Sequence, residues 1–326
     1  MPKVSILVPT YNYARFLPEA IESSLAQEFA DFELIVSDDA STDGSAELIR
    51  HYARRDPRVR VQIHAQNLGM VANWNGCLRA AQGEYIKFMF GDDRFIGRES
   101  LGRMVALLEA SPRVVLAASA RLVLDEKSRT VATWNDWPAP GRHAGRDVVV
   151  RCVREDRNLI GEPSCVLFPR RAAERGFDPA LRQVVDLEMW FHLLAAGDFV
   201  YTSDPLCAFR RHAAQQTEVN RVNSVGPAES IVVLARYLDL VRTHEPSIAR
   251  HRQMLFRRLY YYRKHAPPGS PPLAEERRLR AALGPGWYSL LWLGHRVSKP
   301  LVNLARWLRG RPPSSLVPAT GRQSAG

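Results

Sequence analysis

The chain has 326 residues, of which 46% are hydrophobic and 24% are charged. These values are ordinary for a soluble globular protein, and the length suits one large domain or two smaller ones. The formal net charge of +11 fits nucleic acid, anionic lipid or a phosphate-bearing substrate as partner. Only five of the 45 basic residues are lysine, so an arginine-rich composition also explains part of the charge.

The four cysteines are scattered, with no C-x-x-C pair (Cys77, Cys152, Cys165, Cys207). This spacing argues against a disulfide framework or a cysteine metal cluster. The first residues read as a strand, without the long apolar core of a signal peptide. No run reaches the ~18 to 20 apolar residues of a membrane-spanning helix. We therefore expect a cytoplasmic protein.

Strand and helix patterns alternate over residues 1 to about 120 at the spacing of βαβ units. We predict strands at 4–8, 32–37, 59–64, 84–90 and 114–119, and helices at 15–27, 45–55 and 70–81. This alternation predicts an α/β fold, with a mostly parallel sheet flanked by helices.

Residues 121–215 lose that rhythm. They predict a hairpin over 122–134, a Pro/Gly-rich loop over 137–145, a helix at 186–196, and short strands at 199–202 and 206–210. From residue 227 only helical patterns occur, and the tail 311–326 is predicted to be disordered. We expect a catalytic domain over 1–215 and a helical C-terminal extension over 216–310.

Aspartates stand at three separated points of the chain, and two of these points follow predicted strands. Asp39 and the pair Asp92–Asp93 each follow an apolar strand-like run closely, and Asp186 begins a helix. In an open α/β sheet, ligands bind outside the carboxyl ends of the strands. Carboxylates placed there predict an enzyme that handles a charged, metal-bridged substrate.

Six short motifs occur along the chain in the same order as in a known protein family. They are Val4-Ser-Ile-Leu-Val-Pro-Thr-Tyr-Asn12, Phe32-Glu-Leu-Ile-Val-Ser-Asp-Asp-Ala-Ser-Thr-Asp-Gly44, Asn67-Leu-Gly69, Ala81-Gln-Gly-Glu-Tyr-Ile86 with Gly91-Asp-Asp93, Gly176-Phe-Asp-Pro179 with Asp186-Leu-Glu-Met-Trp190, and Phe209-Arg-Arg-His212. Over residues 3 to about 212 the chain resembles the inverting glycosyltransferases of family 2. That resemblance implies a GT-A (Rossmann-like) fold that binds nucleoside-diphosphate sugars.

The resemblance also implies a metal site. Asp92 and Asp93 match the acidic metal-binding motif, and His212 matches a histidine that contacts the diphosphate or the metal. Hard divalent cations such as Mg²⁺ and Mn²⁺ suit oxygen ligands and neutralise the charge of a departing diphosphate. Arg210 or Arg211 could add phosphate contacts.

Donor-binding residues are implied at the strand ends, and a general base at the helix start. Asp39 matches the carboxylate that reads the nucleotide base, while the remaining donor-binding positions are Pro9, Thr10, Tyr11, Asn67 and Asp92. Asp186 matches the general base that takes the proton of the acceptor hydroxyl. Glu188 is its nearby competitor, but residues two apart on a helix do not share a face.

Three positions depart from the family pattern. Phe90 stands where an additional Asp is frequent, and Val185 replaces a frequent acidic residue before the base. Trp74 takes the place of the arginine in a frequent Ala-Arg-Asn sequence. The metal pair and the base are retained, so we expect activity to be retained.

The segment 287–309 has Trp and Leu at helical spacing, with basic residues between them. This pattern is typical of a helix in a membrane interface, interrupted here at Pro300. An amphipathic helix that packs on the catalytic domain or on a second subunit remains the alternative. The first interpretation predicts a peripheral position on the inner face of the cell membrane.

We therefore predict a metal-dependent inverting glycosyltransferase that uses Mg²⁺ or Mn²⁺. It would move a sugar from a nucleoside-diphosphate sugar to a hydroxyl of a glycan or lipid-linked acceptor, in assembly of a bacterial surface polysaccharide. One alternative is a sugar nucleotidyltransferase, which would need a Gly-rich basic loop after the first strand. The other is a non-catalytic nucleic-acid-binding protein, but aromatic residues are not interleaved with the basic clusters, so no nucleic-acid partner is expected.

Overall fold

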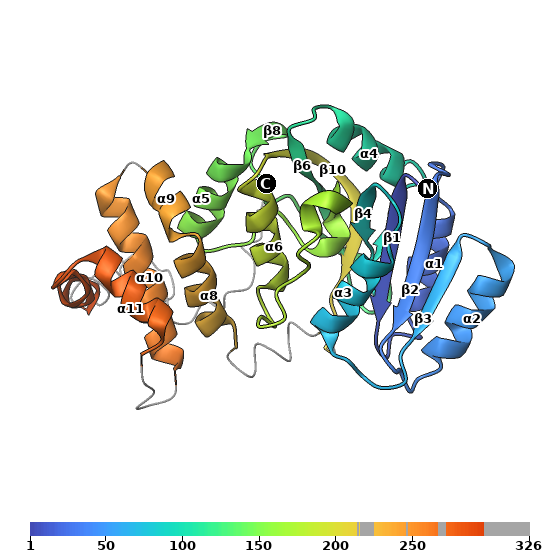
Figure 1. The fold of residues 1–326 in the computed structure, drawn as a ribbon, viewed down its shortest axis with the longest axis horizontal. Helices are drawn as coiled ribbons and strands as arrows, with labels where there is room; N and C mark the ends of the chain where they lie inside the picture. Colours follow the sequence, from blue (N-terminus) through green and yellow to red (C-terminus); the bar gives the residue numbers. More distant parts are fainter. Residues whose placement is uncertain (214, 216–224, 246, 267–271, 297–326) are drawn as a thin grey trace. The chain divides into compact units, whose positions relative to one another are not determined.

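The computed structural model describes residues 1–213, 215, 225–245, 247–266 and 272–296. These residues form two compact units, the first over residues 1–244 and the second from Glu245 onward. The first unit contains the whole sheet (Figure 1). Every predicted site residue also falls within residues 1–244. It also contains α8 and α9, which follow residue 215 in the chain.

The first unit is built on one ten-stranded mixed sheet with the order β3-β2-β1-β4-β9-β6-β10-β5, in which β7 pairs with β6 and β8 pairs with β10. Strands β3, β2, β1 and β4 run parallel to one another, and β6 runs parallel to β10. Strand β9 is antiparallel to both β4 and β6, and β5, β7 and β8 are antiparallel to the strands they pair with. The strands are β1 (Val4–Thr10), β2 (Phe32–Asp38), β3 (Val59–Ile63), β4 (Tyr85–Phe88), β5 (Arg94–Phe95), β6 (Val114–Leu124), β7 (Thr130–Trp134), β8 (Gly141–Ala144), β9 (Val166–Pro169) and β10 (Asp198–Arg210).

Helices flank this sheet, while α8 and α9 pack against other helices of the unit. They are α1 (Leu17–Leu25), α2 (Ser45–Arg55), α3 (Met70–Ala80), α4 (Ser100–Glu109), α5 (Gly145–Glu155), α6 (Val185–Leu194), α8 (Val225–Arg236) and α9 (Leu238–His244), with the short 3₁₀ segments η1 (Pro163–Cys165) and η2 (Arg170–Ala173). Apolar residues of α1 and α4 share one core cluster with alternate residues of β1 and β2. Strands β1 and β2 are buried throughout, which explains their continuous apolar runs.

The predicted α/β architecture is confirmed, and most elements differ from the prediction only at their ends. The predicted loop over 137–145 was wrong in part, because the edge strand β8 occupies residues 141–144 and pairs with β10. The two strands predicted over 199–210 are one strand, β10. Its pairing with β6 shifts register on both sides of Pro205, which has no N–H for the ladder.

Parallel pairing sets the carboxyl ends of β1, β2 and β4 side by side. Thr10 is level with Asp38 at the ends of β1 and β2, and the Asp39 N–H donates to the Thr10 carbonyl at 3.0 Å. Phe88 at the end of β4 is level with Leu7 of β1. The loops that follow these strands therefore converge at one edge of the sheet, as the sequence predicts.

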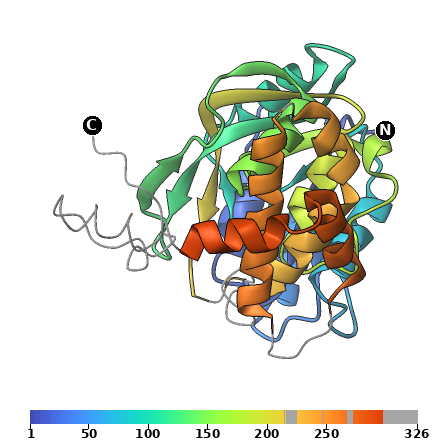
Figure 2. The same cartoon turned by 90° about the vertical axis from the view of Figure 1, so that its left-hand side faces the viewer.

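The second unit is helical in the part that the structure describes, with α10 (Ile248–His265), α11 (Ala274–Leu283) and a further helix over residues 287–296. Figure 2 shows the last helix (red) crossing α10 (orange). Aromatic contacts join the two: Phe256 packs on Tyr288 with ring centroids 5.5 Å apart, and Tyr260 packs on His295 at 4.8 Å. Residues 297–309 of the predicted interface helix and the predicted tail 311–326 lie outside the described residues.

Candidate functional site

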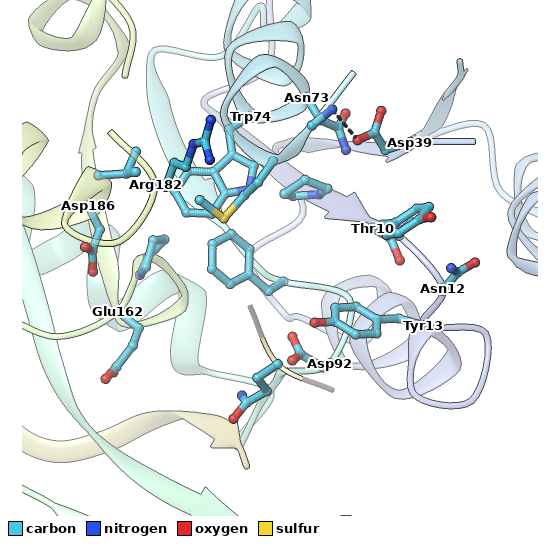
Figure 3. A pocket seen from close by; sticks show the side chains of 18 of the residues that line it. Thr10, Asn12, Tyr13, Asp39, Asn73, Trp74, Asp92, Glu162, Arg182 and Asp186 are labelled. Atoms are coloured by element: carbon cyan, nitrogen blue, oxygen red, sulfur yellow. Dashed lines mark hydrogen bonds between the residues drawn. The ribbon is translucent and has the colours of Figure 1, made fainter. Parts of the chain in front are cut away.

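A cleft of about 450 Å³ lies at the carboxyl edge of the sheet in the first unit. Seven predicted site residues line it: Pro9, Thr10, Tyr11, Asp39, Asn67, Asp92 and Asp186. Figure 3 shows their arrangement, with Asp39 and Thr10 toward one end, Asp186 at the other, and Asp92 between them. The cleft therefore brings together residues from positions 9 to 186 of the chain. Asp93 and His212 are not part of its wall.

The end formed by β1 and β2 is preorganised by hydrogen bonds to Asp39. Each carboxylate oxygen accepts a backbone N–H, from Leu68 at 2.7 Å and from Gly69 at 2.9 Å. The Asn67 side chain donates to the Asp39 carbonyl at 3.1 Å. A carboxylate offers about four lone-pair positions, so each oxygen can accept one more donor. The buried Thr10 hydroxyl beside it has no hydrogen-bond partner among the residues that the structure describes.

Asp43, in the loop after β2, has a structural role. The Asp43 carboxylate accepts the N–H of Ala14 at 2.8 Å and the N–H of Ser45 at 3.1 Å. It therefore joins the loop after β1 to the first turn of α2. The Asn12 N–H also donates to the Ser41 hydroxyl at 2.8 Å. Asp43 is a capping residue, and Asp39 is the one that reaches the cleft.

The acidic pair after β4 divides into one residue at the cleft and one in the interior. Asp92 lines the cleft, and its Oδ2 lies 3.0 Å from Nε2 of His212. Asp93 is buried, and its Oδ1 accepts the Arg210 N–H at 2.9 Å. Burial, together with the charge of Asp92, raises the pKa of Asp93 well above its ordinary value. The geometry favours Asp92 over Asp93 as the carboxylate that meets a ligand.

Asp92 and His212 are the groups here that suit a cation. A carboxylate oxygen and an imidazole nitrogen are ligands that Mn²⁺ accepts, and hard cations often use one or two protein carboxylates and take further oxygens from phosphates and water. Within the described ranges, no three His, Cys, Asp or Glu side chains gather as a metal site. Asp92 and His212 would therefore need further ligands, from a bound molecule or water, to complete the coordination of a cation.

A buried arginine at the end of β10 holds the acidic turn in place. Arg210 is fully buried, and its guanidinium lies 4.6 Å from the ring centroid of Phe16. It donates to Asp92 O at 2.7 Å, Asp125 O at 3.2 Å, Ser128 Oγ at 2.8 Å and Glu19 Oε2 at 3.0 Å. Arg210 was one of two candidates for phosphate contacts, with Arg211, but four guanidinium hydrogen bonds of Arg210 go to the protein itself.

Asp186 lines the opposite end of the cleft, in the first turn of α6. Its Oδ1 accepts the Leu187 N–H at 2.8 Å, and its Oδ2 accepts from the Asn158 side chain at 3.2 Å. Burial raises the pKa of Asp186 to about 7, and the negative charge of Glu162 adds to this effect. A carboxylate with such a pKa can hold a proton taken from a hydroxyl near neutral pH.

Glu188, the competing carboxylate, has a different environment. It is fully buried and outside the cleft, and it forms ion pairs with Arg175 at 2.5 Å and Arg236 at 2.6 Å. The Tyr237 hydroxyl donates to it at 3.1 Å. Glu188 therefore anchors α6 to α8 and is not available to an acceptor.

The approach to α6 is fixed by a residue beyond the predicted domain boundary. Glu229 of α8 accepts three consecutive N–H groups, from Arg182 and Gln183 at 2.7 Å and from Val184 at 3.1 Å. These are orphan donors of the kind found at helix starts, and a side chain from another helix satisfies them. Helix α8 thus helps to place Asp186.

Several cleft residues were not predicted from the sequence, among them Tyr13, Asn73, Glu162, Arg182 and Gln183. Most of them lie in irregular loops, where no periodicity marks a functional side chain. Tyr13 directly follows a predicted motif, so its position was the one available signal. Burial, with the charge of Asp92 next, raises its pKa, and it therefore stays a neutral phenol beside that carboxylate.

Comparison with known proteins decides the family. The model of glycosyl transferase family 2 matches residues 5–177, more than half of the chain. The chain belongs to glycosyl transferase family 2. An uncharacterized Mycobacterium tuberculosis protein is 30% identical over 232 residues, which cover 68% of this chain and 70% of that protein. As a family 2 member the chain is a glycosyltransferase, and the two alternative functions are set aside.

One further protein resembles part of this family 2 chain in sequence, and another resembles most of it in fold. The Bacillus subtilis "Putative teichuronic acid biosynthesis glycosyltransferase TuaG" is 34% identical over 94 residues, which cover 29% of this chain and 37% of TuaG. The mannosyltransferase PcManGT of Pyrobaculum calidifontis, solved in complex with GDP-Man and Mn²⁺, is 20% identical, with a TM-score of 0.57 over 91% of this chain and 80% of its own. The structural likeness confirms the predicted GT-A fold.

Two of the departures from the family 2 pattern are neighbours in space. Trp74 and Phe90 both line the cleft, with ring centroids 4.9 Å apart and planes tilted by 32°. Phe177 packs edge-on against Trp74 at 5.2 Å. Where an Asp and an Arg are frequent, this chain has an aromatic pair that packs well.

The position of Arg210 can be tested by substitution. Replacement of Arg210 with Met should lower the free energy of unfolding by about 3–5 kcal/mol, because the partners of a buried charge lose their donors. Chemical denaturation measures this change. The adjacent exposed Arg211, replaced in the same way, is the matched control and should change stability by no more than about 0.5 kcal/mol. Equal effects of the two substitutions would contradict the assignment.

Proposed function

We propose that this family 2 glycosyltransferase is metal-dependent and inverting, and that it transfers a sugar from a nucleoside-diphosphate sugar to a hydroxyl of a glycan or lipid-linked acceptor. The observation that carries the proposal is Asp186, a carboxylate with a pKa near 7 in the same cleft as Asp92. Similarity to TuaG supports a role in surface polysaccharide assembly. Similarity to PcManGT supports a nucleotide-sugar donor.

The donor would lie along the cleft from the strand ends toward α6. Asp39, already rigid through its two amide partners, would accept the imide N–H of a base such as uracil or thymine. The unpartnered Thr10 hydroxyl beside it would bond to the nucleoside. Pro9, Tyr11 and Asn67 form the surrounding wall. The diphosphate would then reach Asp92.

Asp92 and His212 would hold Mg²⁺ or Mn²⁺, which supplies positive charge to the diphosphate when bound. The remaining work falls to the protein. Asp186 takes the proton of the acceptor hydroxyl while its oxygen bonds to the anomeric carbon, and the bond from that carbon to the diphosphate breaks with its electron pair on the phosphate. Attack from the face opposite the leaving group inverts the anomeric configuration.

Asp186→Asn tests the base. Asparagine keeps the size of the side chain but cannot take a proton, so turnover should fall by roughly 10²- to 10⁴-fold. The dissociation constants of UDP, dTDP or GDP, measured by calorimetry, should stay within about twofold of wild type. Asp186 lies at the end of the cleft opposite Asp39, where the nucleoside would bind. Glu188→Gln is the comparison: it should lose stability and keep its activity per folded molecule. Full activity of Asp186→Asn would disprove the assignment.

Asp92→Asn tests the cation. We expect Mn²⁺ with a nucleoside diphosphate to raise the melting temperature of wild type, since a ligand at 100 times its Kd stabilises a protein by about 2.7 kcal/mol. The Asp92→Asn variant should lose most of the additional stabilisation that Mn²⁺ gives. Asp204→Asn changes an exposed carboxylate of β10 that does not line the cleft, and this variant should retain the stabilisation by Mn²⁺. An equal response of both variants to Mn²⁺ would remove Asp92 from the metal site.

We also propose that the second unit contacts an anionic membrane surface. Its described residues hold ten Arg and Lys against three Asp and Glu. On the helix over 287–296, Leu290 and Leu293 are 57% and 55% exposed, and Trp292 is 37% exposed. Exposed apolar side chains within a basic segment are typical of helices at a lipid interface. No helix in the described ranges has the length and apolar character needed to cross a bilayer.

Vesicle sedimentation tests this surface. The full chain should bind vesicles that contain phosphatidylglycerol and bind phosphatidylcholine vesicles weakly, with binding that falls as salt rises. The double variant Leu290→Gln/Leu293→Gln should bind the anionic vesicles at least about tenfold more weakly, since each buried CH₂ contributes ~0.8 kcal/mol. Val131→Gln, at an equally exposed apolar site of β7, is the control. A double variant that binds vesicles like wild type but no longer dimerises would support packing on a second subunit instead.

A further inference from the structure

A second carboxylate lines the cleft at the same end as Asp186. This is Glu162, in the segment between α5 and η1, and Figure 3 shows it beside Asp186, with Arg182 also at that end. Neither the family motifs nor the proposed mechanism uses Glu162. Its side chain remains 24% exposed although it is paired with an arginine. A rigid, partly open carboxylate next to the base requires an explanation.

Glu162 is held by a buried guanidinium. Arg121 of β6 is only 3% exposed; its Nε lies 2.5 Å from Oε2 of Glu162, and its Nη2 donates to Oε1 at 3.1 Å. Arg121 also donates to Asp136 at 2.9 Å and lies over the ring of Trp134 at 5.0 Å. Arg121 therefore has two carboxylate partners, and of these only Glu162 lines the cleft.

The turn that carries Glu162 is also bonded to Asp186. The Asn158 side-chain oxygen accepts the N–H groups of Ile160 and Gly161 at 3.1 Å. Its amide nitrogen donates to the Gly161 carbonyl at 3.1 Å and to Asp186 at 3.2 Å. The Asn158 amide therefore links the turn that carries Glu162 to Asp186 and helps to fix the distance between these two carboxylates. A substrate that contacts both carboxylates would need such a fixed distance.

The charges around Asp186 come from three segments. Glu162 precedes η1, Arg121 lies on β6, and Arg182 lies on the approach to α6. Beyond the effect of burial, Glu162 raises the pKa of Asp186 and Arg121 lowers it. Glu162 has both carboxylate oxygens facing the Arg121 guanidinium. It remains a hydrogen-bond acceptor.

We propose that Glu162 is an acceptor-binding residue, which accepts a hydrogen bond from a hydroxyl next to the one that reacts at Asp186. The acceptor class is then a sugar or other polyol with neighbouring hydroxyl groups, rather than an isolated alcohol. This inference rests on the glycosyl transfer proposed above. It assigns to Arg121 and Asn158 the role of positioning residues, because they act through Glu162 and Asp186.

The test compares wild type with Glu162→Gln and with Asp136→Asn. The second variant removes the other carboxylate partner of Arg121 and leaves the cleft unchanged, so it is a matched control. The full chain is supplied with Mn²⁺ and the nucleotide sugar that it hydrolyses best, in water that contains either ethylene glycol or methanol. Two quantities are measured. The first is the ratio of the transfer rate to ethylene glycol over the transfer rate to methanol, and the second is the pH at the midpoint of the acidic limb of the pH–rate profile for hydrolysis.

Wild type should prefer ethylene glycol, and Glu162→Gln should reduce this preference by about tenfold, as expected for one hydrogen bond to a charged group. Removal of the negative charge should also move the acidic midpoint of Glu162→Gln to lower pH by about one unit, because Asp186 then ionises more readily. Asp136→Asn should keep both the preference and the midpoint of wild type.

The outcomes separate the two levels of the argument. A wild-type protein that hydrolyses no nucleotide sugar would contradict the proposed function, and this inference with it. An active wild type with an unchanged diol preference in Glu162→Gln would overturn the acceptor role alone. Equal losses in Glu162→Gln and Asp136→Asn would show that Glu162 serves only to hold Arg121, and would overturn it as well.

Discussion

The hydrogen bonds of Arg210 join parts of the chain that are far apart in sequence. This one guanidinium binds α1 through Glu19, the acidic turn through the Asp92 carbonyl, and the loop after β6 through Asp125 and Ser128. A buried arginine without these partners would destabilise the fold, so its burial is tolerated only in the folded arrangement. The position of Asp92 in the cleft is a consequence, since its backbone is one of the partners that Arg210 requires.

A similar constraint acts at the other end of the cleft, where Glu229 accepts three N–H groups ahead of α6. Arg210 and Glu229 have no place in the proposed chemistry, yet each fixes a segment that carries a proposed functional aspartate. The cleft therefore depends on charged residues whose donors and acceptors are used within the protein. Arg210 and Glu229 satisfy backbone groups next to Asp92 and Asp186, and in this way they hold the two segments in place.

The sequence predicted the strand-end part of the site well, for a physical reason. Thr10, Asp39 and Asp92 each lie at or just after the end of a parallel strand, and parallel pairing brings such ends to one edge. The sequence did not predict Glu162 or Arg182, because they lie in irregular segments placed by long-range contacts. Helix α4 is a different case, since its apolar residues recur at helical spacing and the pattern was available (Leu101, Met104, Val105, Leu108).

Asp186 and Glu188 show why residue type alone does not settle chemistry. The two carboxylates are two residues apart on one helix, and the sequence left only the helical geometry to choose between them. In the structure Glu188 faces two arginines and a tyrosine. Asp186 instead faces the cleft and another carboxylate, and its donors are one side-chain amide and one backbone N–H. Burial and a like charge favour the protonated form of a carboxylate, and they raise the pKa of Asp186. The same functional group therefore serves as a structural anchor at one position and is suited to proton transfer at the other.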